Sequence, residues 1–244
     1  MVGLMSLFPH NVKLISTLRF LEGGSSQGSF DNFNLAFHVH DNHNHVLLNR
    51  ILLVDHFNLP SSPAWINQIH SNISVDAELI SSKVYADASY TKQPGIVCAV
   101  LTADCLPIFV SNKKGTVVGI AHAGWKGLAG GIIESLIESL GLNNKDLVVH
   151  LGPAISQLSF EVGEEVRSQY LFKNKNFESC FTCLNEKHYL DLYSAAKVAL
   201  NSCGIFSISG GERCTYNEPN QYFSYRRDGK KSGRMAHLIW IEPD

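Results

Sequence analysis

The most regular pattern along the chain is a series of short apolar runs, rich in Val, Ile and Leu, that turn residues separate from one another. The runs are Ile96–Leu101, Leu106–Val110, Val117–Ala121, Leu147–Leu151 and Met235–Ile241. Because apolar runs of this length are typical of buried strands, they predict one central β-sheet.

Three further segments repeat apolar residues at helical spacing. The first contains Leu128, Ile132, Ile133, Leu136, Ile137 and Leu140, the second Val162, Val166 and Tyr170, and the third Leu192, Ala195, Ala196, Ala199 and Leu200. Gly141 and Gly204 supply the expected stops after the first and third helices. Since strands and helices alternate without a strict βαβ rhythm, the predicted fold class is α/β of the mixed α and β kind, with the strand order open.

The chain is predicted to form one domain that spans residues 1–244, because no repeat or low-complexity linker divides it. Hydrophobic residues make up 45% and charged residues 17%, and the formal net charge is −2, values that are typical of an ordinary globular protein. This balance does not favour nucleic acid as a partner, since binding a phosphate backbone requires a strongly basic face.

The six cysteines are scattered, mostly within apolar stretches, and lack the density of a disulfide framework. We therefore expect reduced thiols. No segment approaches the length of a membrane span, and the N-terminal residues lack the basic start and long apolar run of a secretion signal. The expectation is a cytoplasmic protein with no membrane partner.

Reactive residue types gather in two segments that follow predicted strands, Leu101-Thr-Ala-Asp-Cys-Leu-Pro107 and Ala121-His-Ala-Gly-Trp-Lys-Gly127. Cys105 supplies a potential thiolate, and His122 and His70 supply imidazoles. One thiolate and two imidazoles suit zinc, with the fourth tetrahedral position left to water or substrate. No local spacing pattern joins the three residues, so on spacing alone a buried cysteine and two unrelated histidines are the more common situation.

Separated motifs over nearly the whole chain resemble the YfiH-like laccase-domain family in the right order. They are Asn34-Leu35, His38-Val39, Asp41, Asn49-Arg50, Gln68-Ile-His70, Ala86-Asp-Ala88, Pro94-Gly95, Thr102-Ala-Asp-Cys-Leu-Pro107, Ala121-His-Ala-Gly-Trp125, Gly152-Pro153, Phe160-Glu-Val-Gly163, Phe223-Ser-Tyr-Arg-Arg-Asp-Gly229 and Gly233-Arg234.

The resemblance implies a single-domain sandwich of mixed α/β class, similar to the catalytic domain of a bacterial cytotoxic necrotizing factor. It also implies a zinc site, with copper as the other metal, at His70, Cys105 and His122. Family members are described as purine nucleoside phosphorylases acting on adenosine, inosine, guanosine and methylthioadenosine, with adenosine deaminase activity. Older names refer to a copper-dependent polyphenol oxidase, or laccase, and some bacterial members are linked to editing of peptidoglycan precursors.

Phosphorolysis of a nucleoside requires donors that hold phosphate in line with the sugar carbon, which Arg does best through its bidentate fork. The candidates for binding substrate or phosphate are Arg50, Gln68, Lys126, Arg226, Arg227 and Arg234. Alternatively, Arg226, Arg227 and Lys230 form a solvated basic turn. Lys126 stands where the family usually has Arg, so it should hold an anion less precisely.

Deamination would use the metal to activate water, and Asp104, beside Cys105, is a candidate for moving the proton. Its alternative role is to hydrogen-bond backbone amides of the turn, and both roles remain open. With Cys105 and His122, Asp104 completes the predicted catalytic group.

The sequence also allows three other functions. Cys105 activated by His122 could serve as the nucleophile of a hydrolase or amidase that edits peptidoglycan precursors. A copper-dependent polyphenol oxidase would need a further copper cluster, for which the sequence offers no second ligand set. A binding module without turnover is the third, and the oligomeric state is open. The histidine-rich segment His38–His45 is predicted to be mainly a loop.

Overall fold

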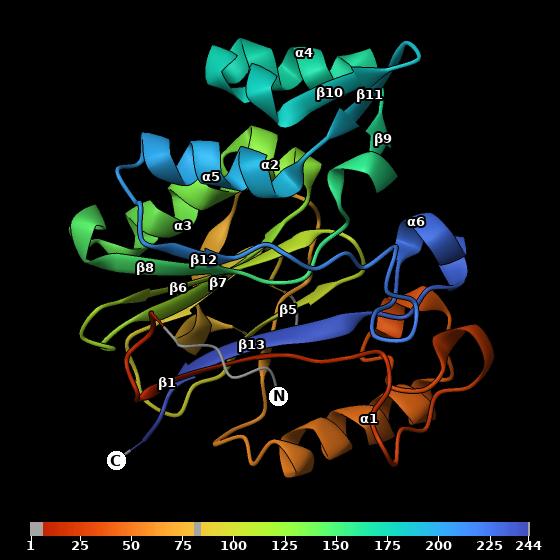
Figure 1. Ribbon diagram of the computed structural model, residues 1–244. Helices are drawn as coiled ribbons and strands as arrows, with labels where there is room; N and C mark the ends of the chain where they lie inside the picture. The colour runs from red at the N-terminus through yellow and green to blue at the C-terminus, as the bar shows by residue number, and fades with distance from the viewer. Residues whose placement is uncertain (1–6, 81–83, 244) are drawn as a thin grey trace.

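In the computed structural model, which describes residues 7–80 and 84–243, two β-sheets lie face to face between layers of helices (Figure 1). The six-stranded sheet has the order β12 (Ile208–Gly210), β8 (Leu147–Leu151), β6 (Leu106–Asn112), β7 (Val118–Ala123), β4 (Ala88–Thr91), β3 (Ser74–Asp76). The four-stranded sheet has the order β1 (Val12–Ser16), β13 (Met235–Ile241), β5 (Cys98–Thr102), β2 (Ala64–Trp65). The predicted mixed α/β class is confirmed.

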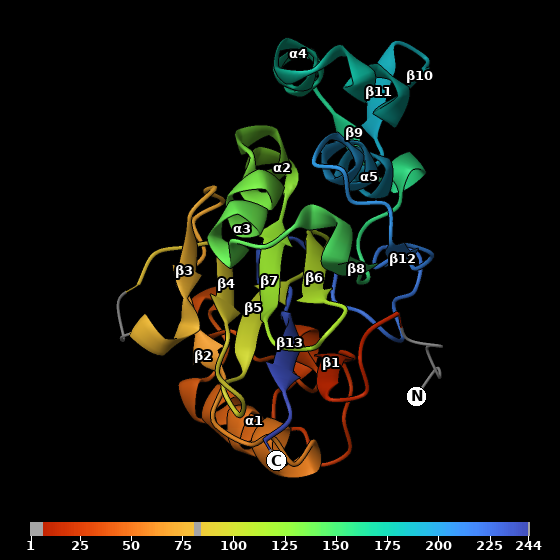
Figure 2. The same ribbon diagram turned by 90° about the vertical axis from the view of Figure 1, so that its left-hand side faces the viewer.

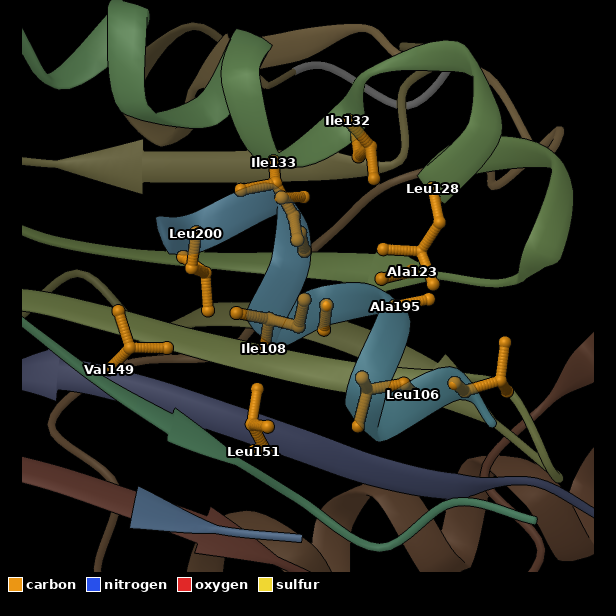
Figure 3. Packing of buried hydrophobic residues seen from close by; sticks show 14 of the residues in the cluster. Leu106, Ile108, Ala123, Leu128, Ile132, Ile133, Val149, Leu151, Ala195 and Leu200 are labelled. Atoms are coloured by element: carbon orange, nitrogen blue, oxygen red, sulfur yellow. The ribbon is translucent and has the colours of Figure 1, made fainter. Parts of the chain in front are cut away.

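Helices cover the outer face of each sheet (Figures 1 and 2). The helices over the six-stranded sheet are α2 (Trp125–Gly130), α3 (Ile132–Leu140) and α5 (Leu192–Ser202), and the helix over the four-stranded sheet is α1 (His43–His56). Figure 3 shows side chains of α2, α3 and α5 meeting those of β6 and β8 in one apolar layer. This layer supports the strand ends from which the site is built.

Alternate residues of a strand belong to different apolar layers. On β13, Ile239 and Ile241 pack between the two sheets, whereas Leu238 and Trp240 pack in the layer that includes Leu53 of α1. A strand that is buried on both faces needs apolar residues at successive positions. The central strands therefore appear in the sequence as mainly apolar runs.

A smaller unit stands beyond α5 (Figures 1 and 2). It contains the antiparallel sheet β10 (Phe181–Leu184), β11 (Lys187–Leu190), β9 (Glu161–Val162) and the helix α4 (Glu164–Lys173). The Tyr170 hydroxyl donates to the backbone oxygen of Trp125 at 2.9 Å, which ties α4 to the body. A short helix, α6 (Tyr225–Asp228), and the 3-10 turns Gly28–Phe30, Phe37–Val39, Ala77–Leu79, Asn144–Asp146, Gln157–Ser159, Lys175–Cys180 and Gly229–Lys231 complete the elements.

The five predicted strands are all present, and two of them, Leu147–Leu151 and Met235–Ile241, have the predicted bounds. The prediction of one central sheet is wrong, because β5 and β13 belong to the four-stranded sheet and β6, β7 and β8 to the six-stranded sheet. An apolar run shows that a strand is buried, but it contains no information on which sheet the strand joins.

The predicted helices differ from the observed ones in three places. The first is divided at Gly131, whose φ of 93° ends α2 before α3 begins. Val162 lies in β9 rather than in α4. Within His38–His45 only residues 40–42 are loop, since His38 and Val39 lie in the 3-10 turn Phe37–Val39 and α1 begins at His43 with the Asn42 side chain accepting from the Asn44 N–H.

No disulfide joins any of the six cysteines, all of which lie within the described part of the chain, in agreement with the expected reduced thiols. Over residues 7–80 and 84–243, no helix has both the length and the apolar character that crossing a membrane requires.

Candidate metal centre

The three predicted metal ligands meet at the ends of strands from both sheets. His70 lies in the turn after β2, Cys105 lies between β5 and β6, and His122 lies on β7. One ligand atom from each residue lies within 4.8 Å of the other two. The rings of His70 and His122 meet edge to face, with centroids 4.8 Å apart. Segments separated by up to 52 positions thus place a thiol and two imidazoles around one point.

A buried carboxylate, Asp87, orients two of these ligands. Its oxygens accept the backbone N–H groups of Ile69, His70 and Ser71 at 3.2, 3.0 and 2.6 Å. They also accept the Ser71 hydroxyl at 2.7 Å and lie 2.8 Å from Nδ1 of His122. With Nδ1 held by the carboxylate, Nε2 of His122 is the nitrogen available to an ion.

The charges at the centre reinforce one another. Burial would raise the pKa of Asp87, but the hydrogen bonds from His122 and Ser71 outweigh it and lower that pKa to about 2. Burial likewise opposes ionisation of Cys105, yet the charge and hydrogen bond of His122 lower the Cys105 pKa to about 6. Burial lowers the pKa of His122, but the Cys105 thiolate and Asp87 together raise it to about 9. The centre therefore holds the thiol in its ligand form.

Gly124 makes room for the thiolate. Because β6 pairs with β7 so that Leu106 lies opposite Ala123, Gly124 is the residue that faces Cys105. A Cβ at Gly124 would lie 2.9 Å from the Cys105 Sγ and 3.3 Å from the Cδ2 of His70. One thiolate and two imidazoles, one of them held by a buried carboxylate, fit a borderline-soft divalent cation.

The ligands line a cavity of about 570 Å³, which we call the metal pocket. Its aromatic lining residues are Trp125, Phe160 and Tyr225, and its cationic ones, apart from the histidines, are Lys126, Arg226 and Arg234. Phe160 directly precedes β9 and Tyr225 is the first residue of α6, so segments far from the three ligands in the sequence contribute to the pocket wall. The cavity can therefore hold a flat aromatic group beside an anion.

Asp104 lies next to Cys105 and both of its carboxylate oxygens accept a hydrogen bond. Oδ1 accepts from the Thr215 hydroxyl and Oδ2 from the Arg226 N–H, each at 2.6 Å. Its backbone oxygen accepts the Ile155 N–H at 3.0 Å, and its φ is 90°. Asp104 thus joins the Cys105 turn to the start of α6.

The predicted substrate-binding arginines are placed differently from one another. Arg226 and Arg234 line the metal pocket. Arg227 does not, because its guanidinium donates to the backbone oxygens of Thr215, Tyr216 and Tyr222 and to the Asp228 carboxylate. Its contacts are those of a residue that holds the 215–228 segment together.

Gln68 lines the metal pocket, whereas Arg50 lines only the cavity beside it. The Gln68 amide donates to the backbone oxygen of Leu101 at 2.8 Å and accepts the Leu101 N–H at 2.7 Å. Arg50 lies between the rings of Phe37 and Trp65, in a neighbouring cavity that Gln68 also lines. Gln68 is thus fixed by the strand edge, and Arg50 faces a separate space.

Sequence reasoning gave no role to Asp87 and none to His38, which lines the metal pocket. Both lie inside motifs that carried the family resemblance. The signal in the sequence for Asp87 was its position between two alanines, which indicates an acid in an apolar, buried setting. A buried acid needs hydrogen-bond partners, so such a position indicates a structural or functional role.

Known proteins match this chain along almost its whole length. The family model described as multi-copper polyphenol oxidoreductase laccase matches residues 15–242. "Purine nucleoside phosphorylase YfiH" of Escherichia coli (strain K12) is 43% identical over 235 residues, which cover 96% of this chain and 95% of that protein. A purine nucleoside phosphorylase of Haemophilus influenzae is 39% identical over 237 residues, with 96% of each chain covered.

Solved structures show the same architecture. A Neisseria meningitidis protein superposes with a TM-score of 0.92 at 40% identity and covers 98% of this chain and 97% of its own. The YfiH protein of Bacillus licheniformis superposes with a TM-score of 0.86 at 29% identity and covers 95% of this chain and 93% of its own. The motifs, the fold and the matched length agree: the chain belongs to the YfiH-like family described as multi-copper polyphenol oxidoreductase laccase.

Proposed function

We propose that the protein is a metal-dependent purine nucleoside phosphorylase in which His70, Cys105 and His122 hold a zinc ion. The observation that carries this proposal is the metal pocket itself, where a three-ligand centre lies beside aromatic rings and cationic side chains. Two relatives that match over 95% or more of their length bear the name of this activity.

Zinc rather than copper is the metal that we assign. In the described part of the chain, this is the single cluster of three or more His, Cys, Asp or Glu residues whose ligand atoms converge. Laccase chemistry would need further clustered histidines for oxygen reduction. When bound, zinc supplies a Lewis acid that polarises a substrate oxygen.

The aromatic residues of the pocket provide surfaces for a purine. Phe160 and Tyr225 already bear a guanidinium on one face, from Arg226 at 5.1 Å and Arg234 at 5.6 Å respectively. Stacking of a flat base against such rings is favourable and leaves the edges of the base for polar recognition. We therefore assign purine binding to the wall formed by Phe160, Tyr225 and Trp125.

Phosphate is assigned to the cationic side of the pocket. Arg234 donates through Nη1 to the backbone oxygens of Ser232 and Gly233, which leaves Nε and Nη2 without a partner among the described residues. Burial, followed by the charges of Arg234, Arg50 and His122, lowers the pKa of His38. The same positive potential favours an anion at this place, and holding phosphate there supplies proximity and charge stabilisation.

The test is a product assay with adenosine or inosine, with and without phosphate. We expect free base and a sugar phosphate that form only when phosphate is present. Arg234→Lys should raise the KM for phosphate by about tenfold, because the bidentate fork is lost. The matched control Arg167→Lys changes an arginine on α4 that pairs with Glu164 and with Glu178 of the following 3-10 turn, and it should leave KM unchanged. Absence of any phosphate-dependent product would refute the proposal.

Adenosine deamination is included as a side activity of the same pocket. It requires a proton carrier, and both Asp104 oxygens already accept hydrogen bonds. We therefore assign Asp104 a positioning role, in which it holds α6 against the Cys105 turn. Adenosine converted to inosine without phosphate would support the side activity, and an unchanged nucleoside would exclude it.

A second candidate function rests on the lowered pKa of Cys105 beside His122. This pairing is also that of a nucleophilic cysteine, which would make the protein a hydrolase or amidase. In metal-free protein, a mild electrophile should then label Cys105 and not the exposed Cys183. Hydrolase activity that remains after the metal is removed, and that labelling of Cys105 then blocks, would favour the hydrolase.

A further inference from the structure

A second cavity, of about 850 Å³, opens beside the metal pocket, and the proposed reaction makes no use of it. Its walls are largely apolar and include Trp65, Ile66, Ala77 and Ile96. His38, Gln68 and Leu101 line both cavities, so the two spaces adjoin. We call this space the Trp65 compartment.

One cation, Arg50, lines the Trp65 compartment, and its charge acts on His38, which lines both cavities. Its guanidinium carbon is 4.4 Å from the centre of the Phe37 ring and 4.1 Å from that of Trp65. Nε donates to the backbone oxygen of Leu35 at 2.9 Å, and neither Nη atom has a partner among the described residues. Two parallel N–H donors held by aromatic rings are the arrangement that binds a phosphate bidentately.

Among residues 7–80 and 84–243, no acidic side chain forms an ion pair with Arg50. Burial lowers its pKa to about 10. The single acidic residue among the lining residues of the Trp65 compartment, Glu78, is exposed and forms no ion pair with it. A partly buried cation that lacks a counter-charge is costly unless a ligand supplies one.

We propose that the Trp65 compartment binds the apolar or aromatic part of an organic phosphate whose phosphate group lies against Arg50, next to the metal pocket. A dianion suits the combined field of Arg50 and Arg234, and the ring or chain attached to it would displace water from the apolar wall. The proposal rests on the proposed function only in placing phosphate on this side of the metal pocket. Its ligand would compete with inorganic phosphate.

The experiment compares the binding of 1-naphthyl phosphate and inorganic phosphate to the metal-loaded protein by titration calorimetry. We expect the naphthyl ester to bind at least about tenfold more tightly, because burying its ring adds apolar contact that inorganic phosphate lacks. Inorganic phosphate should displace it. Equal affinities, or a naphthyl ester that phosphate does not displace, would overturn the proposal.

Two variants locate the binding site. Ser62→Trp fills the mouth of the Trp65 compartment from an exposed position and should abolish the tenfold preference, whereas Ser202→Trp, at an exposed position on α5, should keep it. Arg50→Gln should weaken both ligands. A preference that survives Ser62→Trp would place the naphthyl ring elsewhere and refute the proposal. Because binding alone is measured, these results do not depend on whether phosphorolysis occurs.

Discussion

His122 on β7 and His237 on β13 lie in facing sheets, are 4% and 0% exposed, and each forms hydrogen bonds to side chains from distant segments. His122 contacts the Asp87 carboxylate and the Cys105 thiol, and its pKa is raised to about 9. The partners of His237 are hydroxyls, Thr102 at Nε2 and Ser16 at Nδ1, both at 2.8 Å. Burial, with a smaller contribution from the charge of His122, lowers the pKa of His237 to about 3.

The difference shows that burial alone does not make a histidine functional. Both rings are removed from water, which disfavours the charged form of each. Only His122 has a thiolate and a carboxylate to reverse this effect, and only His122 keeps a nitrogen for an ion, since hydroxyls occupy both nitrogens of His237. The chemistry of the centre is therefore made by the partners that the fold brings to the imidazole.

Cys105→Ala removes the partner that most distinguishes the two environments, and it should have the largest effect. We expect the bound metal to fall to a small fraction of one equivalent and the rate of phosphorolysis to fall by more than about a hundredfold, because a ligand is lost and not merely reoriented. Metal analysis and the product assay measure both. Cys183→Ala, an exposed cysteine on β10, is the matched control and should behave as wild type. Full metal content in Cys105→Ala would show that the centre is not the binding site.

Asp87→Asn should rank second. The amide offers one oxygen acceptor where the carboxylate serves three backbone N–H groups, a hydroxyl and His122. We expect metal affinity, measured by competition with a chelator, to fall by about 10- to 100-fold. Asp76→Asn, which alters a carboxylate that caps a 3-10 turn, should leave metal affinity unchanged. If Asp87→Asn and Asp76→Asn bind the metal with equal affinity, the Asp87 carboxylate does not orient His122.

His237→Gln tests how the buried, neutral His237 makes the free energy of unfolding depend on pH. The folded-state pKa of about 3 lies below the unfolded value, so the unfolded chain binds a proton first, and stability is lost as pH falls from about 6.5 toward 3. At pH 5 the loss is about 2 kcal/mol. Glutamine can bond to both hydroxyls without charging, so urea unfolding should show a smaller loss between pH 7.5 and pH 5 in the variant. Equal losses would mean that His237 does not resist protonation.

The burial of strands could be predicted from the sequence, whereas their pairing could not. Leu147–Leu151 and Met235–Ile241 have the predicted bounds because strands covered on both faces are apolar at most successive positions. Their assignment to different sheets depends on long-range pairing, which that signal does not encode. The missed helix α1 exposes Leu47, Leu48 and Ile51, so its apolar residues do not form one clear stripe.

For the candidate site, the ligands could be named from motifs, but their supporting groups could not. Asp87 reaches His122 because β4 pairs with β7 so that Ala88 lies opposite Ala121. Arg227 and Arg234 belong to neighbouring basic motifs, yet one is consumed by backbone oxygens and the other lines the metal pocket. These roles follow from chain segments that meet only in the folded protein.

Gly124→Ala should have the smallest of these effects, and it asks how closely the thiolate must approach His122. The new Cβ would lie 2.9 Å from the Cys105 Sγ, so the sulfur must shift by a few tenths of an ångström, and metal affinity should fall by about three- to tenfold. Gly130→Ala, at the other end of α2, meets no atom closer than 3.9 Å and should not weaken metal binding. A chelator competition on the two variants separates crowding at the sulfur from any general effect on α2. Equal metal affinities of Gly124→Ala and Gly130→Ala would mean that the centre tolerates a displaced thiolate. The difference between His122 and His237 would then depend on Asp87 alone.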